Sequence, residues 1–180
     1  MDLVYSKENQ KNATLSLISG EPAYEIYTAG KFLQSEPTWI RKYQCSEQRP
    51  VEIGQVRVRS FHNDVCQLRG KDIRPRSIDS LSTKRSFTSL ANGQKYIWKR
   101  KFSKAKLLDN TKNTIAVYEE SHSGFLSTKA PAKISVAPDG MPIIDEIVVT
   151  FVYFERKFKD DIEEIDAAWN LVSLVGMVTS

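Results

Sequence analysis

Residues 143–154 read IIDEIVVTFVYF, a long run of β-branched and aromatic side chains. Such side chains favour strands because they fit a pleated surface. The run is apolar at odd and even positions alike, which is typical of a central strand covered on both faces. The sequence therefore predicts a central strand over residues 142–154, after a turn at Pro138-Asp139-Gly140.

Short strand-like segments separated by turn signals fill the chain before this run. The clearest pair is 86–90 and 94–100, which flank Asn92-Gly93, because Asn-Gly favours the turns that match the twist of paired strands. Residues 51–61 alternate apolar and polar side chains as a half-buried strand does, with Gly54 as the site of a bulge. About eleven strands are expected before the last segment.

The last 21 residues change to a helical pattern. Acidic residues gather at 160–164, where they suit the positive end of a helix dipole and resemble a capping box. From Ala167 onward nearly every residue is apolar, and a helix that is apolar on every side has to be buried on every side. We therefore expect helix 160–178 to lie in the core of a single domain that spans residues 1–180.

Three segments, 92–99 (NGQKYIWK), 114–118 and 141–154, resemble a fungal family of unassigned function that is grouped with the tubby C-terminal-like and LURP-one-like (scramblase-like) barrels. The resemblance covers roughly residues 12–158. It implies a mostly β fold, a closed antiparallel barrel of about twelve strands around a buried helix at 160–178. Closure also removes the free strand edges that invite aggregation.

The family implies no reaction. The wider group includes phosphoinositide-binding domains and proteins associated with phospholipid movement, and the resemblance carries no individual binding residue over to this chain.

Composition places the chain among ordinary globular proteins, with 41% apolar and 27% charged residues. The start, MDLVYSKENQ, lacks the basic and apolar regions of a secretory leader, and no run of about 18 apolar residues predicts a membrane-spanning helix. The two cysteines, Cys45 and Cys66, are too few for a disulfide scaffold. We therefore expect a cytoplasmic protein.

Residues that could carry catalysis or hold a metal are sparse. His62 and His122 lie sixty positions apart, and neither has a cysteine or carboxylate at ligand spacing. Ser60, His62 and Asp64 are close in sequence, and Cys66 follows them, but a catalytic triad is a spatial arrangement and not a local run. We expect no enzymatic activity, no metal and no cofactor; a hydrolase built on Ser60 or Cys66 is the weakest alternative.

Basic residues give the strongest functional signal. Residues 1–159 hold all 26 Lys and Arg against 17 of the 22 acidic residues, a net charge of +9. Arg57 and Arg59 alternate on one predicted strand face, and Lys99 and Lys101 alternate on another. Two cations at positions i and i+2 can hold a phosphate between them, and the alternative is that they protect strand edges from pairing.

These patterns predict a non-enzymatic module that binds anionic phospholipid headgroups as a peripheral membrane protein, through Arg57, Arg59, Lys99 and Lys101. If the two strands are neighbours, the four cations form one patch about 5 Å wide. A protein-interaction or scaffold domain is the alternative. No specific nucleic-acid binding is expected, because the aromatic residues Tyr96 and Trp98 fit the core of a strand better than a base-stacking surface.

Overall fold

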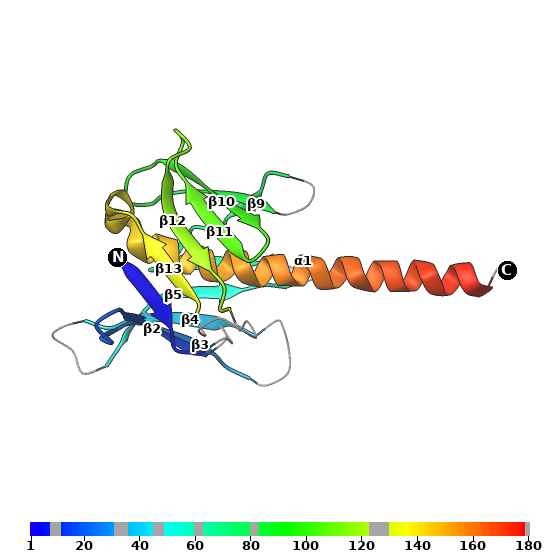
Figure 1. The fold of residues 1–180 in the computed structure, drawn as a ribbon, viewed down its shortest axis with the longest axis horizontal. Coiled ribbons are helices and arrows are strands. Elements are labelled where there is room, and N and C mark those ends of the chain that lie inside the picture. The colour runs from blue at the N-terminus through cyan, green and yellow to red at the C-terminus, as the bar shows by residue number, and fades with distance from the viewer. Residues whose placement is uncertain are drawn as a thin grey trace.

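The computed structural model describes residues 1–7, 12–30, 36–44, 49–59, 63–79, 83–122 and 130–178, with side chains as far as Glu163 and of Ile165. Within these residues the fold is mostly β, one antiparallel sheet and one long helix (Figure 1). The elements are β1 (Asp2–Tyr5), β2 (Ala13–Leu17), β3 (Pro22–Thr28), β4 (Thr38–Lys42), β5 (Val51–Arg57), β6 (Val65–Leu68), β7 (Lys71–Asp72), β8 (Arg76–Ser77), β9 (Lys84–Thr88), β10 (Lys95–Lys101), β11 (Lys104–Leu108), β12 (Thr114–Glu119), β13 (Lys133–Val136), the short 3-10 helix η1 (Pro138–Ile143) and α1 (Ile144–Val178).

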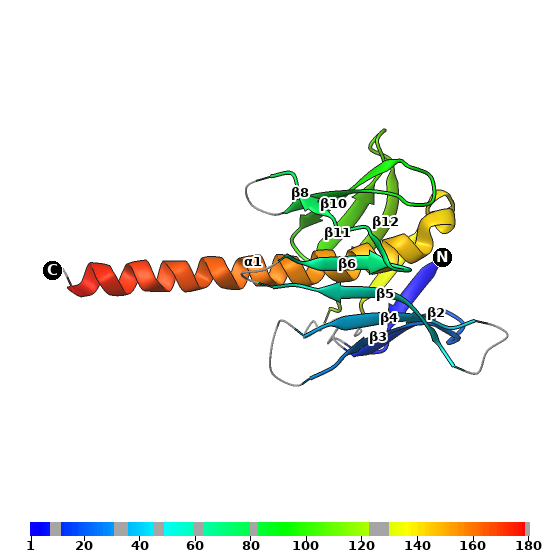
Figure 2. The same ribbon diagram turned by 180° about the vertical axis from the view of Figure 1, so that it is seen from behind.

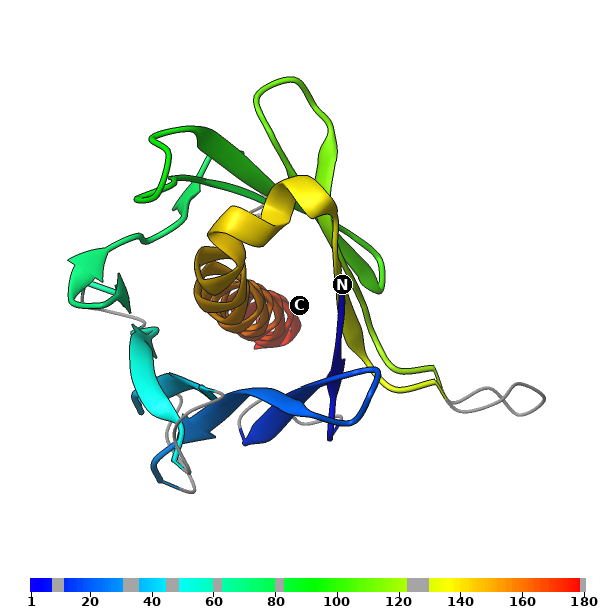
Figure 3. The same cartoon turned by 90° about the vertical axis from the view of Figure 1, so that its left-hand side faces the viewer.

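The sheet curls around α1 without closing (Figure 3). Its 13 strands run in the order β7-β6-β5-β4-β3-β2-β1-β13-β12-β11-β10-β9-β8, so β7 and β8 are its two free ends. The predicted closed barrel is therefore wrong. The β9–β10 hairpin predicted from Asn92-Gly93 is confirmed, with Tyr96 opposite Phe87 and Trp98 opposite Arg85.

The open seam follows from how the chain crosses between the two ends of the sheet. One extended segment pairs first with β6, where Ile73 N–H donates to Cys66 C=O at 2.9 Å, and then with β9, where Ile78 N–H donates to Lys84 C=O at 3.1 Å. Each pairing lasts only two residues as a strand. Pro75 lies between them and has no N–H to donate, so β7 and β8 are joined by the chain and not by hydrogen bonds.

The predicted strand at 142–154 is also wrong, because Pro142 and Ile143 end η1 and residues 144–154 begin α1. Val148, Val149 and Phe151 are fully buried inside the curled sheet. A strand enclosed there would leave its N–H and C=O groups without neighbours, whereas a helix satisfies them within itself. The need to pair the backbone thus outweighs the strand preference of the β-branched side chains.

The predicted burial of helix 160–178 is wrong as well. It is part of α1, a continuous helix of 35 residues, and it runs out beyond the sheet (Figures 1 and 2). Ile162 and Ile165, the last large apolar side chains described, are 40% and 47% exposed. The part of α1 that the sheet encloses is Ile144–Glu155, which starts where the sequence predicted a strand.

Gly54 allows the helix to approach the sheet closely. A Cβ atom at this position would lie 2.7 Å from a methyl group of Val149 and 3.0 Å from the Gln67 carbonyl oxygen. The pairing of β5 with β4 shifts register here, since Ile40 faces Gly54 while Arg41 faces Glu52, which confirms the predicted bulge. Backbone-to-helix packing at this point fixes α1 inside the curve of the sheet.

Candidate anion-binding surface

The structure does not bring the four predicted cationic residues into one patch. Arg57 ends β5 and Arg59 follows it, whereas Lys99 and Lys101 lie on β10. In the sheet β5 and β10 are not neighbours, so the condition for a single narrow patch is not met.

Both pairs nevertheless lie toward the end of the sheet from which α1 leaves, which we call the helix-exit end. Near the first pair, Asp64 accepts hydrogen bonds from the Arg59 N–H at 2.8 Å and from the Tyr153 hydroxyl at 2.9 Å. Near the second pair, Arg100 binds Glu155 and its guanidinium lies 4.7 Å from the Phe158 ring centre. The two pairs thus lie level with residues 153–158 of α1, on different strands.

Lysines face one another on the outer surface of β9, β10 and β11. Lys99 lies opposite Lys84 on β9 and opposite Lys106 on β11, and Lys101 lies opposite Lys104. Lys104 pairs with Glu119 at 2.6 Å, but Lys99 and Lys106 have no acidic partner among the described residues. Like charges directly opposite each other destabilise a sheet, so this arrangement costs stability unless an anion covers it.

Phe102 stands at the tip of the β10–β11 hairpin, between these lysines. Its side chain is 86% exposed, and its backbone has a φ of 53°, a left-handed conformation that is uncommon for a residue other than glycine. The Lys101 amino group lies 5.8 Å from the ring centre. We call residues 99–106, with sequence KRKFSKAK, the lysine hairpin. Sequence reasoning missed Phe102, although an aromatic residue in a turn between lysines is a visible signal.

A profile of the DUF6593 family, a family of unknown function, matches residues 8–160. The chain belongs to the DUF6593 family. The match includes both predicted cationic pairs and the lysine hairpin, and it stops just where α1 leaves the sheet. Searches among curated proteins and among solved structures found no match.

Not every cation of this DUF6593 protein is available to a ligand. Arg85 is 5% exposed and binds Asp161 at 2.6 Å, so it holds α1 against the sheet. Arg100, between the outward Lys99 and Lys101, points inward to Glu155 and Glu120. Burial alone would lower the pKa of Arg100, but the two carboxylates outweigh it and raise that pKa. These two arginines therefore belong to the interior.

The hydrolase alternative finds no support in the described residues. Ser60 and His62 lie outside them. Asp64 is already bound by Arg59 and Tyr153, and burial raises the pKa of the Cys66 thiol well above its ordinary value, which disfavours the reactive thiolate.

Two features are absent from the described part of the chain. It contains no group of three or more His, Cys, Asp and Glu residues arranged to hold a metal ion. It also contains no helix with the length and apolarity needed to cross a membrane.

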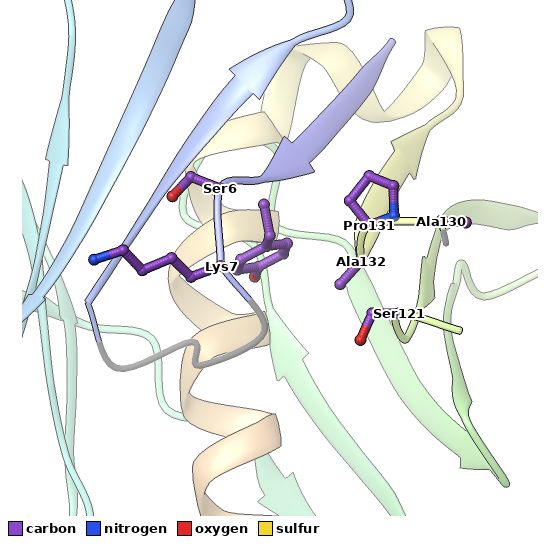
Figure 4. A pocket seen from close by; sticks show the side chains of 7 residues that line it. Ser6, Lys7, Ser121, Ala130, Pro131 and Ala132 are labelled. Carbon is purple, nitrogen blue, oxygen red and sulfur yellow. The ribbon is translucent and has the colours of Figure 1, made fainter. Parts of the chain in front are cut away.

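A cavity of about 210 Å³ opens between the end of β1 and the segment before β13 (Figure 4). Ser6 and Lys7 line one side, and Ser121, Pro131 and their neighbours line the other. The Ser6 hydroxyl oxygen accepts a hydrogen bond from Thr14 N–H at 2.9 Å. The described residues that line this cavity include no histidine and no carboxylate.

Proposed function

We propose that this protein binds anionic phospholipid headgroups as a peripheral membrane protein, through the lysine hairpin. The observation that carries the proposal is Phe102, which is 86% exposed at a hairpin tip flanked by Lys101 and Lys104. An aromatic ring at such a tip can enter the headgroup region while the adjacent ammonium groups stay at the phosphates. Lys99 and Lys106 face the same side and lack acidic partners among the described residues.

The expected attachment is weak and reversible. Each lysine near an anionic surface contributes about 1 kcal/mol, and burying an aromatic side chain contributes about 2 kcal/mol more. The cytoplasmic leaflet carries the anionic lipids, so we propose that the protein acts there. The resemblance of segments 92–99 and 141–154 to a group that includes phosphoinositide-binding domains supports the same class of ligand.

Arg57 and Arg59 are proposed as a second, smaller contact. They lie toward the same helix-exit end as the lysine hairpin, because Asp64 joins Arg59 to Tyr153 of α1. Because α1 projects beyond the sheet at this end and the two pairs lie on strands that are not neighbours, Arg57 and Arg59 are proposed to contact headgroups separately from the lysine hairpin.

Co-sedimentation with vesicles tests the proposal. Vesicles of phosphatidylcholine, with and without phosphatidylserine, are mixed with the protein at low and at physiological ionic strength. We expect binding only with phosphatidylserine and less of it at the higher salt, because salt screens exposed charges. Lys99→Glu with Lys101→Glu should abolish binding, Phe102→Asp should weaken it strongly, and Arg59→Glu alone should weaken it less.

A matched control makes the same change of charge at the other end of the sheet. Lys71→Glu with Lys112→Glu replaces two exposed lysines, one at the start of β7 and one in the β11–β12 turn, away from the lysine hairpin. This variant should bind vesicles nearly as the wild type does. The membrane proposal fails if the wild type stays in the supernatant at both salts, or if the two double variants lose binding equally.

A protein-interaction role is the second candidate, and the outward part of α1 favours it. Ile162 and Ile165 are exposed and three positions apart, so they lie on one side of the helix. Apolar contacts resist salt, unlike phosphate contacts. If vesicles are not bound and the protein sediments as an oligomer at high salt, with Ile162→Asp restoring the monomer, this second role replaces the first.

A further inference from the structure

A small pocket lies at the end of the sheet opposite the lysine hairpin. Its volume is about 200 Å³, and it opens between the β6–β7 turn and the turn that follows β9. Six residues line it: Leu68, Arg69, Lys71, Leu90, Ala91 and Glu146. All of them belong to the described residues and none has a part in the proposed membrane contact.

Glu146 gives this pocket a buried carboxylate. It belongs to the first turn of α1 and is 3% exposed. One of its carboxylate oxygens, Oε1, accepts a hydrogen bond from the Ala91 N–H at 2.9 Å. The other, Oε2, is buried and has no hydrogen-bond partner. A buried carboxylate oxygen without a donor is costly, so it indicates a ligand that brings one.

The rim of the pocket carries the opposite charge. Arg69 is occupied, because it binds Asp145 at 2.6 Å and that carboxylate also binds Lys42 at 2.8 Å. Lys71 is exposed and forms no ion pair with any described residue. Between the carboxylate and this amino group the walls are apolar, formed by Leu68 and by Leu90, which is 44% exposed.

We propose that this pocket binds a free amino acid with an apolar side chain. Its ammonium group donates to the Glu146 carboxylate, its carboxylate meets Lys71, and its side chain packs against Leu68 and Leu90. The opposite charges at the two ends select a zwitterion over a simple amine or acid. The pocket is below the size of most drug-sized sites and suits a single small molecule.

Isothermal titration calorimetry of the full chain with three probes tests the proposal. L-leucine carries both charges, leucinamide lacks the carboxylate, and 4-methylpentanoate lacks the ammonium group. We expect L-leucine to bind and each analogue to bind at least about tenfold more weakly, because each loses one charge-assisted contact. Absence of binding of L-leucine to the folded wild type overturns the proposal.

Two variants assign the contacts. Glu146→Gln keeps an oxygen for the Ala91 N–H but removes the charge, so its affinity for L-leucine should fall to that of 4-methylpentanoate for the wild type. Lys71→Ala should bind L-leucine and leucinamide equally. Lys112→Ala, an exposed lysine in another turn, should change nothing. Unchanged L-leucine binding in both Glu146→Gln and Lys71→Ala, with folding checked by circular dichroism, contradicts the proposal; it leaves the membrane proposal untouched.

Discussion

α1 is one continuous helix, but its enclosed half, Ile144–Glu155, and its outward half, residues 160–178, have opposite surroundings. In the enclosed half, Ile147, Val149 and Phe151 have no exposed surface. In the outward half, Ile162 and Ile165 expose more than a third of theirs. The enclosed half is rich in β-branched residues that disfavour a helix, and the outward half begins with acidic residues that favour a helix start.

The difference teaches that enclosure, and not intrinsic preference, decides the structure of the enclosed half. Inside the curled sheet every side of the backbone is cut off from water, and only a helix pairs all its own N–H and C=O groups. The DUF6593 match ends at residue 160, so it contains the enclosed half and omits nearly all of the outward half.

The largest expected effect is the loss of an enclosed aromatic side chain. Phe151 packs 4.5 Å from the Tyr118 ring centre and 5.3 Å from that of Trp98. Phe151→Ala should lower the free energy of unfolding by about 4 kcal/mol, the transfer cost together with the cost of a cavity. Chemical denaturation measured by Trp fluorescence gives this value.

Ile162→Ala in the outward half is the matched control for that experiment. With 40% of the side chain already exposed, its loss should cost less than about 1 kcal/mol. If the two substitutions have equal effects, the contrast between the two halves of α1 does not exist.

Arg100 marks the point where α1 passes from one half to the other, and its removal should have the next largest effect. Arg100→Met leaves Glu155, which has no exposed surface, without its cation. Breaking a buried pair in this way costs about 3 kcal/mol at neutral pH.

The pH dependence of Arg100→Met identifies the cause. Burial already raises the pKa of Glu155 in the folded wild type, and loss of the guanidinium raises it further. When the pKa of a carboxyl group is higher in the folded state than in the unfolded state, the folded state binds the proton more tightly. The protein therefore gains stability as the pH falls from the folded pKa toward the unfolded pKa. The loss of stability in Arg100→Met, relative to the wild type, should therefore become smaller at acidic pH. A loss that stays constant between neutral and mildly acidic pH would show that lost packing, and not the Glu155 charge, is its cause.

The strands were easier to predict than the helix, for a physical reason. The β9–β10 hairpin has a local turn signal in Asn92-Gly93, and alternation correctly placed Trp98 in the core and Lys99 outside. Residues 143–154 are buried on all sides, and a pattern that is apolar on all sides does not distinguish an enclosed helix from a central strand. The open seam lies between two short local pairings, β7 with β6 and β8 with β9, and each pairing taken alone does not reveal that β7 and β8 remain unpaired with each other.

The residues of the candidate sites also differ in how far they could be predicted from the sequence. The outward positions of Lys99 and Lys101 follow from strand alternation, so they could be predicted from the sequence. Glu146 was interpreted as part of a strand, and its place in a pocket depends on the helix and on the contact with Ala91, which lies 55 residues away. Long-range contacts of this kind are invisible to reasoning from neighbouring residues.

The start of the enclosed half should respond to acid in the opposite direction to Glu155. Burial alone would raise the pKa of Asp145, but hydrogen bonds from Lys42, Tyr24 and Arg69 outweigh it and hold that pKa below its usual value. The stabilisation by ionised Asp145 is complete above about pH 3.9, the pKa of an aspartate in the unfolded chain. This stabilisation is lost as the pH falls through the lower pKa of the folded state. Asp145→Asn should lower the free energy of unfolding by about 2 kcal/mol at neutral pH and by progressively less below about pH 4. Thermal denaturation of both proteins over this pH range measures the difference. A difference that does not change with pH would exclude the Asp145 charge as the cause.

The smallest expected effect is the removal of residues 166–178, the last part of the outward half. A chain that ends at Ile165 keeps the pairs Lys157–Asp160 at 2.7 Å and Arg85–Asp161 at 2.6 Å, which hold α1 at the point where it leaves the sheet. If helix 160–178 filled a closed barrel, as the sequence predicted, shortening it would leave the barrel open, but the enclosed half fills the curled sheet without these residues. We expect the truncated protein to be monomeric, with a free energy of unfolding within about 0.5 kcal/mol of the full chain. Sedimentation velocity checks the monomeric state, and chemical denaturation checks the free energy of unfolding. Aggregation or a large loss of stability would show that the outward half also supports the sheet, and the division of α1 into two unlike halves would then be wrong.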